Sequence, residues 1–234
     1  MASETELGTI VNFVAHVHVA LALGGSRSDD AGVAFGAALP DLASMAGCRI
    51  DRPALPEAVR EGVLLHHLTD GVFHSLPEFT TGVRRLGEDL RARGLARGPS
   101  RAVGHAGWEL LLDGCLLERP GGEEAFDRVL RSAPDVAGSV SPADPDRWRR
   151  LVGGMRRDRW WLEYSDTEVV AHRLQRLLRA RTRISFEVGQ IPLVAGALAV
   201  AKPGVRLDAD RVMRAVIAAL AGDDPLVSGD RRPA

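Results

Sequence analysis

The residues from Glu61 to Pro77, EGVLLHHLTDGVFHSLP, decide what kind of fold this chain adopts. Their apolar residues recur at three- and four-residue steps, which predicts an amphipathic helix. His66, Asp70 and His74 are spaced four apart and so share one face of that helix, where two side chains can reach a single ion. Imidazole nitrogen and carboxylate oxygen together suit manganese, iron or zinc better than calcium. The stretch predicts a metal or acid–base site, with a partly buried helix of locally hydrogen-bonded histidines as the alternative.

The same helical period runs through most of the chain, whereas alternating, strand-like stretches are short and few. With 234 residues and 45% hydrophobic content, the chain can bury one sizeable core. We therefore expect a single all-α domain over residues 1–234. Its first helix is predicted over residues 4–23. In the C-terminal part, residues 186–234, we expect helices over 186–201 and 208–220, followed by a frayed tail.

Composition argues against several classes of function. Thirty basic residues against thirty-one acidic ones leave no global field of the kind that draws proteins to nucleic acid. Cys48 and Cys115 are too few for a disulfide framework, and the N-terminal MASETELG lacks the basic region of a signal peptide. The longest uncharged apolar run, from Val188 to Ala201, is shorter than the roughly 20 residues of a membrane span. We expect a cytoplasmic protein with reduced thiols and no membrane span.

Two further groups of polar residues lie on apolar helices. His16 and His18, in NFVAHVHVA, are two residues apart and point about 200° apart on a helix, so only one of them is expected to face a given site. His105, Glu109 and Asp113, in HAGWELLLDG, are spaced four apart on one face. If this face packs against that of His66, the carboxylates and imidazoles would surround a metal or compensate one another. A buried salt-bridge and hydrogen-bond network without metal is the alternative.

Several of these motifs together resemble a known family. NFVAHVHVALA is similar to the opening NFLAHLHLA-type segment of the bacterial acyl carrier protein phosphodiesterases. The family's GNLLAD stretch resembles residues 35–41, FGAALPD, and its GIxLHRxIDxFTDxHP stretch resembles residues 62–77. The resemblance continues through LLLDG and covers most of residues 10–185, so that 1–185 is the family-like region.

This resemblance implies a compact, HD-domain-like bundle of helices that hydrolyses a phosphodiester. The family removes 4′-phosphopantetheine from the serine of holo acyl carrier protein, which implies an acidic acyl or peptidyl carrier protein as partner. It also implies a divalent metal, manganese first, with iron or zinc as alternatives. The implied metal ligands are His16, Asp41, His66, Asp70 and Asp113. His67 and His105 are the residues expected to move protons.

The chain also departs from the family pattern. His67 stands where the family has Arg, His74 where it has a second Asp, and Gly114 where it has the His after Asp113. These differences leave room for a helical binding or scaffold protein that has lost catalysis, and for a hydrolase of small phosphoesters. Two arginine groups would suit a phosphate or an acidic partner, or would simply be solvated helix faces. They comprise Arg84, Arg85, Arg91 and Arg93, and Arg156, Arg157 and Arg159.

Overall fold

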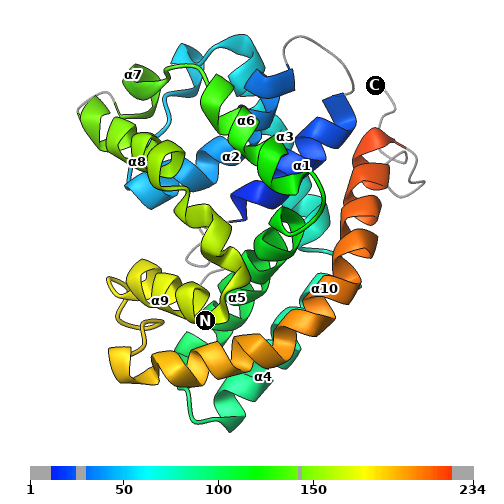
Figure 1. Cartoon of the computed structure of the whole chain (residues 1–234), viewed down its shortest axis with the longest axis vertical. Helices are drawn as coiled ribbons and strands as arrows, with labels where there is room; N and C mark the ends of the chain where they lie inside the picture. Colours follow the sequence, from blue (N-terminus) through cyan, green and yellow to red (C-terminus); the bar gives the residue numbers. More distant parts are fainter. Residues whose placement is uncertain (1–11, 25–29, 142–143, 223–234) are drawn as a thin grey trace, which may run out of the picture.

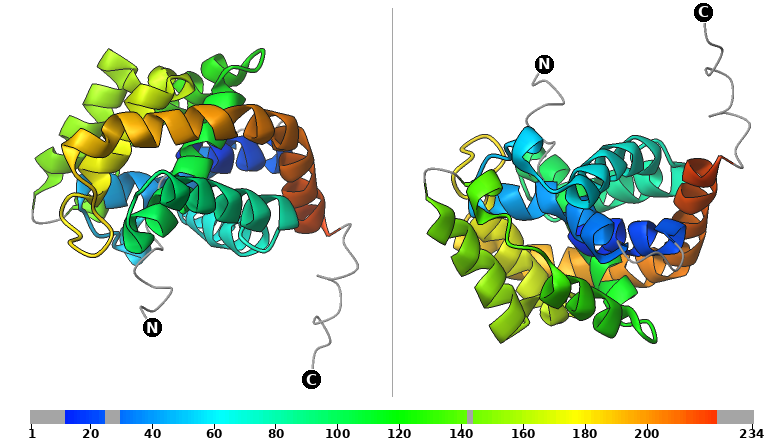
Figure 2. Two further views of the ribbon diagram at one scale, coloured as in Figure 1. Left: turned by 90° about the horizontal axis from the view of Figure 1, so that it is seen from below. Right: turned by 90° about the horizontal axis from the view of Figure 1, so that it is seen from above.

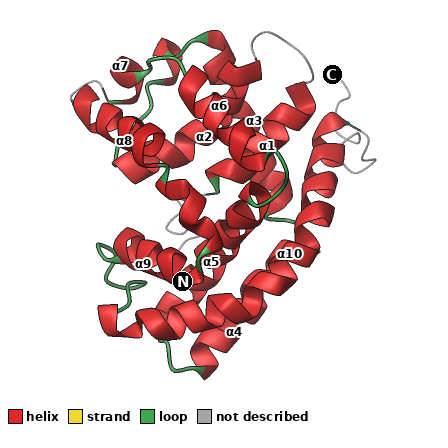
Figure 3. Cartoon of the chain, viewed as in Figure 1, coloured by secondary structure: helices red, strands yellow, loops and turns green. Residues whose placement is uncertain are grey.

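Helices make up all the regular structure of the described residues, and no strand occurs among them (Figure 3). The structure is a computed structural model, and it describes residues 12–24, 30–141 and 144–222. In chain order the elements are α1 (Phe13–Gly24), α2 (Asp30–Ala46), η2 (Arg52–Ala54), α3 (Glu57–Phe73), α4 (Pro77–Ala92), α5 (Arg97–Leu117), α6 (Gly122–Ser132), α7 (Ala137–Val140), α8 (Pro145–Asp158), η3 (Trp160–Ser165), α9 (Thr167–Leu178), η4 (Val188–Gln190) and α10 (Ile191–Ala221). The all-α prediction is confirmed.

The C-terminal helices differ from the prediction. The sequence predicts two helices over 186–201 and 208–220, but a single α10 spans both. Pro203 lies inside it, and Figure 2 shows α10 changing direction near its middle. A proline inside a helix removes one backbone hydrogen bond and bends the helix, and here it does not end it. The predicted frayed tail and residues 4–11 of the first predicted helix lie outside the described residues.

By length and composition alone, the segment Val188–Ala221 could cross a membrane. This finding carries little weight, because the core helices of other proteins pass the same test. In this structure α10 packs against α1, α3, α4, α5 and α9, and its buried residues belong to the same hydrophobic core as theirs. It therefore has the contacts of a helix of the bundle.

α5 is the central helix of the bundle (Figure 1). From Pro99 to Leu117 every residue except Arg101 and His105 is buried. α5 contacts α1, α4, α6, α9, η3 and α10, which together surround it. A helix that is buried on nearly all sides brings its polar residues into the interior, where they need partners.

Glycines allow α2 and α3 to pack with their backbones in close contact. A Cβ on Gly36 would lie 2.2 Å from the carbonyl oxygen of Val59, and one on Gly62 would lie 2.1 Å from that of Val33. Any other residue at either position would push the helices apart. The close approach brings the backbone of α2 within reach of the polar face of α3.

A buried carboxylate of α5 holds the start of α1. Asp113 accepts hydrogen bonds from the backbone N–H groups of Val14 and Ala15, at 3.1 and 2.9 Å. The first N–H groups of a helix have no partner within the helix, so this side chain satisfies two of them. The contact sets the position of α1 and hence of His16.

Candidate metal centre

His16 of α1 meets His66 and Asp70 of α3 in the interior, and we call these three residues the α1–α3 cluster. The Nε2 atom of His16 lies 3.2 Å from Oδ1 of Asp70, and that of His66 lies 3.4 Å from Oδ2. One ligand atom from each residue can be chosen so that all three lie within 4.8 Å of one another. The structure therefore brings together three of the five residues expected to bind metal.

The backbone of α2 orients His66. Its Nδ1 donates a hydrogen bond to the carbonyl oxygen of Ala37 at 2.9 Å, because a carbonyl can only accept. This places a proton on Nδ1 and leaves Nε2 facing Asp70, where it can bind a metal once it has lost its own proton. A backbone carbonyl that holds the second nitrogen of a histidine is a typical feature of metal sites.

Asp41 of α2 lies at the edge of the α1–α3 cluster. Its Oδ2 is 4.0 Å from Nε2 of His16, and this buried oxygen has no hydrogen-bond partner within residues 12–24, 30–141 and 144–222. In the same part of the chain neither ring nitrogen of His16 has a hydrogen bond of good geometry, even though Asp70 is close. Buried polar atoms without partners are costly, and a bound cation would satisfy the carboxylate oxygen and the imidazole together.

Burial and close charges together set the protonation of the α1–α3 cluster. Burial lowers the pKa of His16 to about 4 and raises the pKa of Asp41 to about 8. Burial opposes ionisation of Asp70 and protonation of His66, but the attraction between these side chains holds the pKa of Asp70 well below the usual range and raises that of His66. At neutral pH His16 is neutral and Asp70 is ionised, which are the forms that bind metal, and a metal would displace the proton that His66 shares with Asp70.

A second group forms where the C-terminal end of α3 meets α5, and we call it the α3–α5 cluster. The Nε2 atoms of His74 and His105 each lie 3.1 Å from Oε1 of Glu109. Glu109 is buried, whereas His74 is 37% exposed at its side chain. The sequence leaves open whether the polar faces of these helices meet, and it groups His74 with Asp70. Packing instead places it with the two residues of α5.

Asp113, His67 and His18 occupy other surroundings. Both oxygens of Asp113 are bonded to the backbone of α1, so this residue belongs to neither cluster. The exposed His67 accepts a hydrogen bond from Arg52 at its Nε2. The charges that affect the pKa of His18 are those of Arg119 and Asp210, which lie outside both clusters. His16 is therefore the histidine of α1 that faces the α1–α3 cluster.

An arginine-lined groove of about 370 Å³ lies between α4 and α5 and reaches His105. Its arginines are Arg84, Arg91, Arg97 and Arg101. Arg84 pairs with Glu88 at 2.9 Å. Within the described part of the chain, the other three have no ion partner. The groove therefore presents free guanidinium groups beside the α3–α5 cluster.

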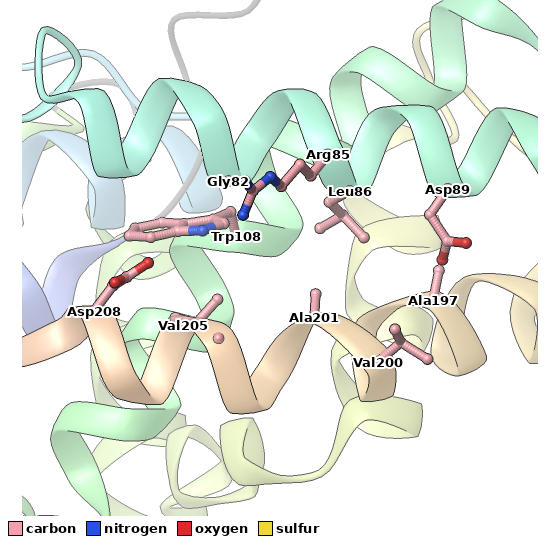
Figure 4. Close-up of a pocket in the computed structure, with 11 residues that line it drawn as sticks. Gly82, Arg85, Leu86, Asp89, Trp108, Ala197, Val200, Ala201, Val205 and Asp208 are labelled. Atoms are coloured by element: carbon pink, nitrogen blue, oxygen red, sulfur yellow. The ribbon is translucent and has the colours of Figure 1, made fainter.

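A pocket of about 270 Å³ lies between α4 and α10, with Trp108 of α5 as part of its wall (Figure 4). Figure 4 shows Leu86, Ala201 and Val205 around this space, with Arg85 extending toward Trp108 and with Asp208 and Asp89 at opposite ends. No residue of either cluster lines it. This pocket is therefore separate from both clusters.

Comparison of the chain with protein-family models, with curated proteins and with solved structures finds no significant match in any of the three. The class of protein must therefore be inferred from the site itself and from the sequence motifs.

Proposed function

We propose that this protein is a metal-dependent phosphodiester hydrolase with an HD-domain-like arrangement of helices, and that the α1–α3 cluster is its metal centre. The observation that carries the proposal is the meeting of His16, His66 and Asp70 in the interior, with ligand atoms 3.2 and 3.4 Å apart. Two imidazoles and a carboxylate are a ligand set of catalytic metal sites. The motif resemblance to the acyl carrier protein phosphodiesterases supplies the reaction class.

Distances within the α1–α3 cluster suit a metal. Bonds of about 2.0–2.1 Å in tetrahedral geometry place neighbouring ligand atoms about 3.3–3.4 Å apart. The two observed spacings are within about 0.2 Å of this range but involve different oxygens of Asp70, and with one ligand atom from each residue the three atoms lie within 4.8 Å of one another, so an ion would draw the side chains together. The unpartnered Oδ2 of Asp41 offers a fourth ligand atom or a hydrogen-bond acceptor for a water.

A divalent metal in this place would lower the pKa of a bound water and offset the charge of the phosphoryl oxygens. The protein's own residues have separate tasks. Ala37 holds His66 in the tautomer that presents Nε2, and Asp113 fixes α1 so that His16 remains in place. Asp41, with its pKa raised to about 8 by burial, can hold or release a proton near neutral pH.

The arginines in the groove between α4 and α5 support the proposal that the substrate is anionic. Arg91, Arg97 and Arg101 are free to bind phosphate, which a guanidinium contacts through two parallel hydrogen bonds. A groove of about 370 Å³ is large enough for a phosphoester group. The exposed arginines around it would also attract an acidic carrier protein, which is the partner that the family resemblance suggests.

A non-catalytic helical binding or scaffold protein is the second candidate. The observation in its favour is that His67 and Asp113, two residues expected to serve catalysis or metal binding, make other contacts here. In such a protein the clusters would serve stability and specificity of packing alone.

Metal analysis combined with a hydrolysis assay tests the proposal. Protein purified without chelator is assayed for manganese, iron and zinc, and then for release of 4′-phosphopantetheine from holo carrier protein and of nitrophenol from bis(4-nitrophenyl) phosphate. We expect His66→Asn and Asp70→Asn to lose metal and activity, while His18→Asn, a matched change outside the α1–α3 cluster, keeps both. A folded wild type that takes up no divalent ion would overturn the proposal in favour of the scaffold.

A further inference from the structure

We propose that His74, His105 and Glu109 form a second divalent-metal site, distinct from the α1–α3 cluster and suited to zinc. The α3–α5 cluster offers two imidazoles and one carboxylate, a set that binds zinc with one position left open. The proposal concerns cation binding and does not depend on phosphodiester hydrolysis.

The geometry of the cluster is close to that of a metal site. Both Nε2 atoms lie 3.1 Å from the same oxygen, Oε1 of Glu109, and all three ligand atoms lie within 4.8 Å of one another. A tetrahedral zinc site needs ligand atoms about 3.3–3.4 Å apart. In the metal-free protein His74 is hydrogen-bonded to Glu109, so a cation would take the place of the proton between them.

The surroundings of Glu109 give evidence for a cation that does not depend on these distances. Its side chain is 2% exposed, and its other oxygen, Oε2, is buried with no hydrogen-bond partner among the described residues. Burial opposes ionisation, but His105 and His74 hold its pKa below the usual value. The site thus contains a buried carboxylate with one oxygen unsatisfied, and a cation would compensate it.

An aromatic side chain holds both imidazoles in position. Phe79 of α4 stacks on His74, with ring centroids 5.0 Å apart, and meets His105 edge-on at 5.2 Å. Trp108 packs edge-on against Phe79 at 5.3 Å from the far side. Rings fixed by such packing lose little entropy when they bind an ion, which favours binding.

The cluster is open to solvent on one side. His74 is 37% exposed at its side chain, and His105 lines the groove between α4 and α5. A fourth ligand can therefore be a water or an anion held by Arg101 and its neighbours. In the α1–α3 cluster His16 is fully buried, and that cluster reaches solvent through Asp70, whose side chain is 34% exposed.

The two sites lie about one helical turn apart on α3. Asp70 belongs to the first and His74 to the second, and the two groups have no residue in common. A paired-metal centre holds its two ions as one unit about 3.5–4 Å apart. We therefore infer two neighbouring mononuclear sites and not one centre with a shared ligand.

Cobalt titration of chelator-treated, full-length protein tests the second site, with visible absorption to count the equivalents bound and zinc to displace them. The wild type is expected to bind two equivalents. His74→Ala and His105→Ala should each lower the affinity for one of them by more than about 100-fold, because they remove a ligand. His66→Ala should affect the other equivalent alone. Glu124→Gln, which changes an exposed carboxylate on α6 far from the groove residues, is the matched control and should leave both unchanged.

Each outcome separates the two proposals. A single equivalent that is lost in His66→Ala and retained in His74→Ala would overturn the second site and support the first. A single equivalent that both variants lose would show one shared site and would also overturn it. One equivalent lost in His74→Ala alone would support the second site and contradict the α1–α3 metal centre. Because His74 is half-exposed at the end of α3, His74→Ala is expected to fold.

Discussion

The α1–α3 and α3–α5 clusters contain the same kinds of side chain, yet their surroundings give these side chains different properties. In the first, burial dominates at His16 and lowers its pKa to about 4, although at His66 the carboxylates of Asp70 and Asp41 outweigh burial and raise the pKa. In the second, burial also acts on His105, but the charge of Glu109 outweighs it and raises the pKa. The comparison teaches that residue type and helical spacing do not determine protonation, because the helices that cover the cluster decide it.

The largest expected effect is on stability, and it comes from removing the contact of Asp113 with α1, which positions the α1–α3 cluster alone. Asp113→Ala leaves two buried N–H groups of α1 without an acceptor, each costing about 1–3 kcal/mol, so we expect a loss of about 2–6 kcal/mol in the free energy of unfolding. Urea denaturation measures it. His16 should lose its position, whereas the α3–α5 cluster contains no residue of α1. Asp113→Asn keeps one acceptor and should cost about half as much; equal stability of all three proteins would contradict the role of Asp113.

A second prediction concerns how the stability of the metal-free protein changes with pH. The folded pKa of Asp41, about 8, is above its unfolded value of 3.8, so folding retains a proton and stability falls as pH rises between these values. His16 makes stability rise with pH, but only between about pH 4 and 6.5, where this histidine is protonated in the unfolded state alone. The raised pKa values of His66 and His105 add to the loss of stability above pH 6.5.

We therefore expect the free energy of unfolding to decrease from pH 6.5 to 8, by up to about 1.4 kcal/mol per pH unit for each contributing group. Asp41→Asn should reduce this slope, as followed by urea denaturation at several pH values with chelator present. His18→Asn serves as the control, because the pKa of His18 is lowered and its titration lies below this range. An unchanged slope in Asp41→Asn would mean that Asp41 is already ionised in the folded state.

The smallest expected effect concerns the groove beside the α3–α5 cluster. Arg101→Gln removes an exposed guanidinium that has no ion partner, and it should raise the KM for an anionic phosphodiester a few-fold with little change in kcat. Arg84→Gln is the matched change, since Glu88 already neutralises Arg84. Steady-state kinetics at two salt concentrations would show the difference. A fall in kcat without a change in KM would place Arg101 outside substrate binding.

Local spacing was sufficient to predict much of the helical fold and part of both clusters. The four-residue steps that join His66 to Asp70 and His105 to Glu109 are properties of one helix each, and both pairs are in contact in the structure. The continuity of α10 through Pro203 was not predictable in this way, because contacts with five other helices outweigh the loss of one hydrogen bond.

The sequence by itself determined that the chain is helical and that imidazoles and carboxylates share helix faces, since helical periodicity is local. Only the tertiary structure decided which faces meet. In it, His16 and not His18 faces the α1–α3 cluster, Asp113 binds the start of α1, and His74 lies beside Glu109. The physical reason is that the rotation and separation of packed helices depend on contacts between residues distant in sequence, such as the glycine contacts between α2 and α3.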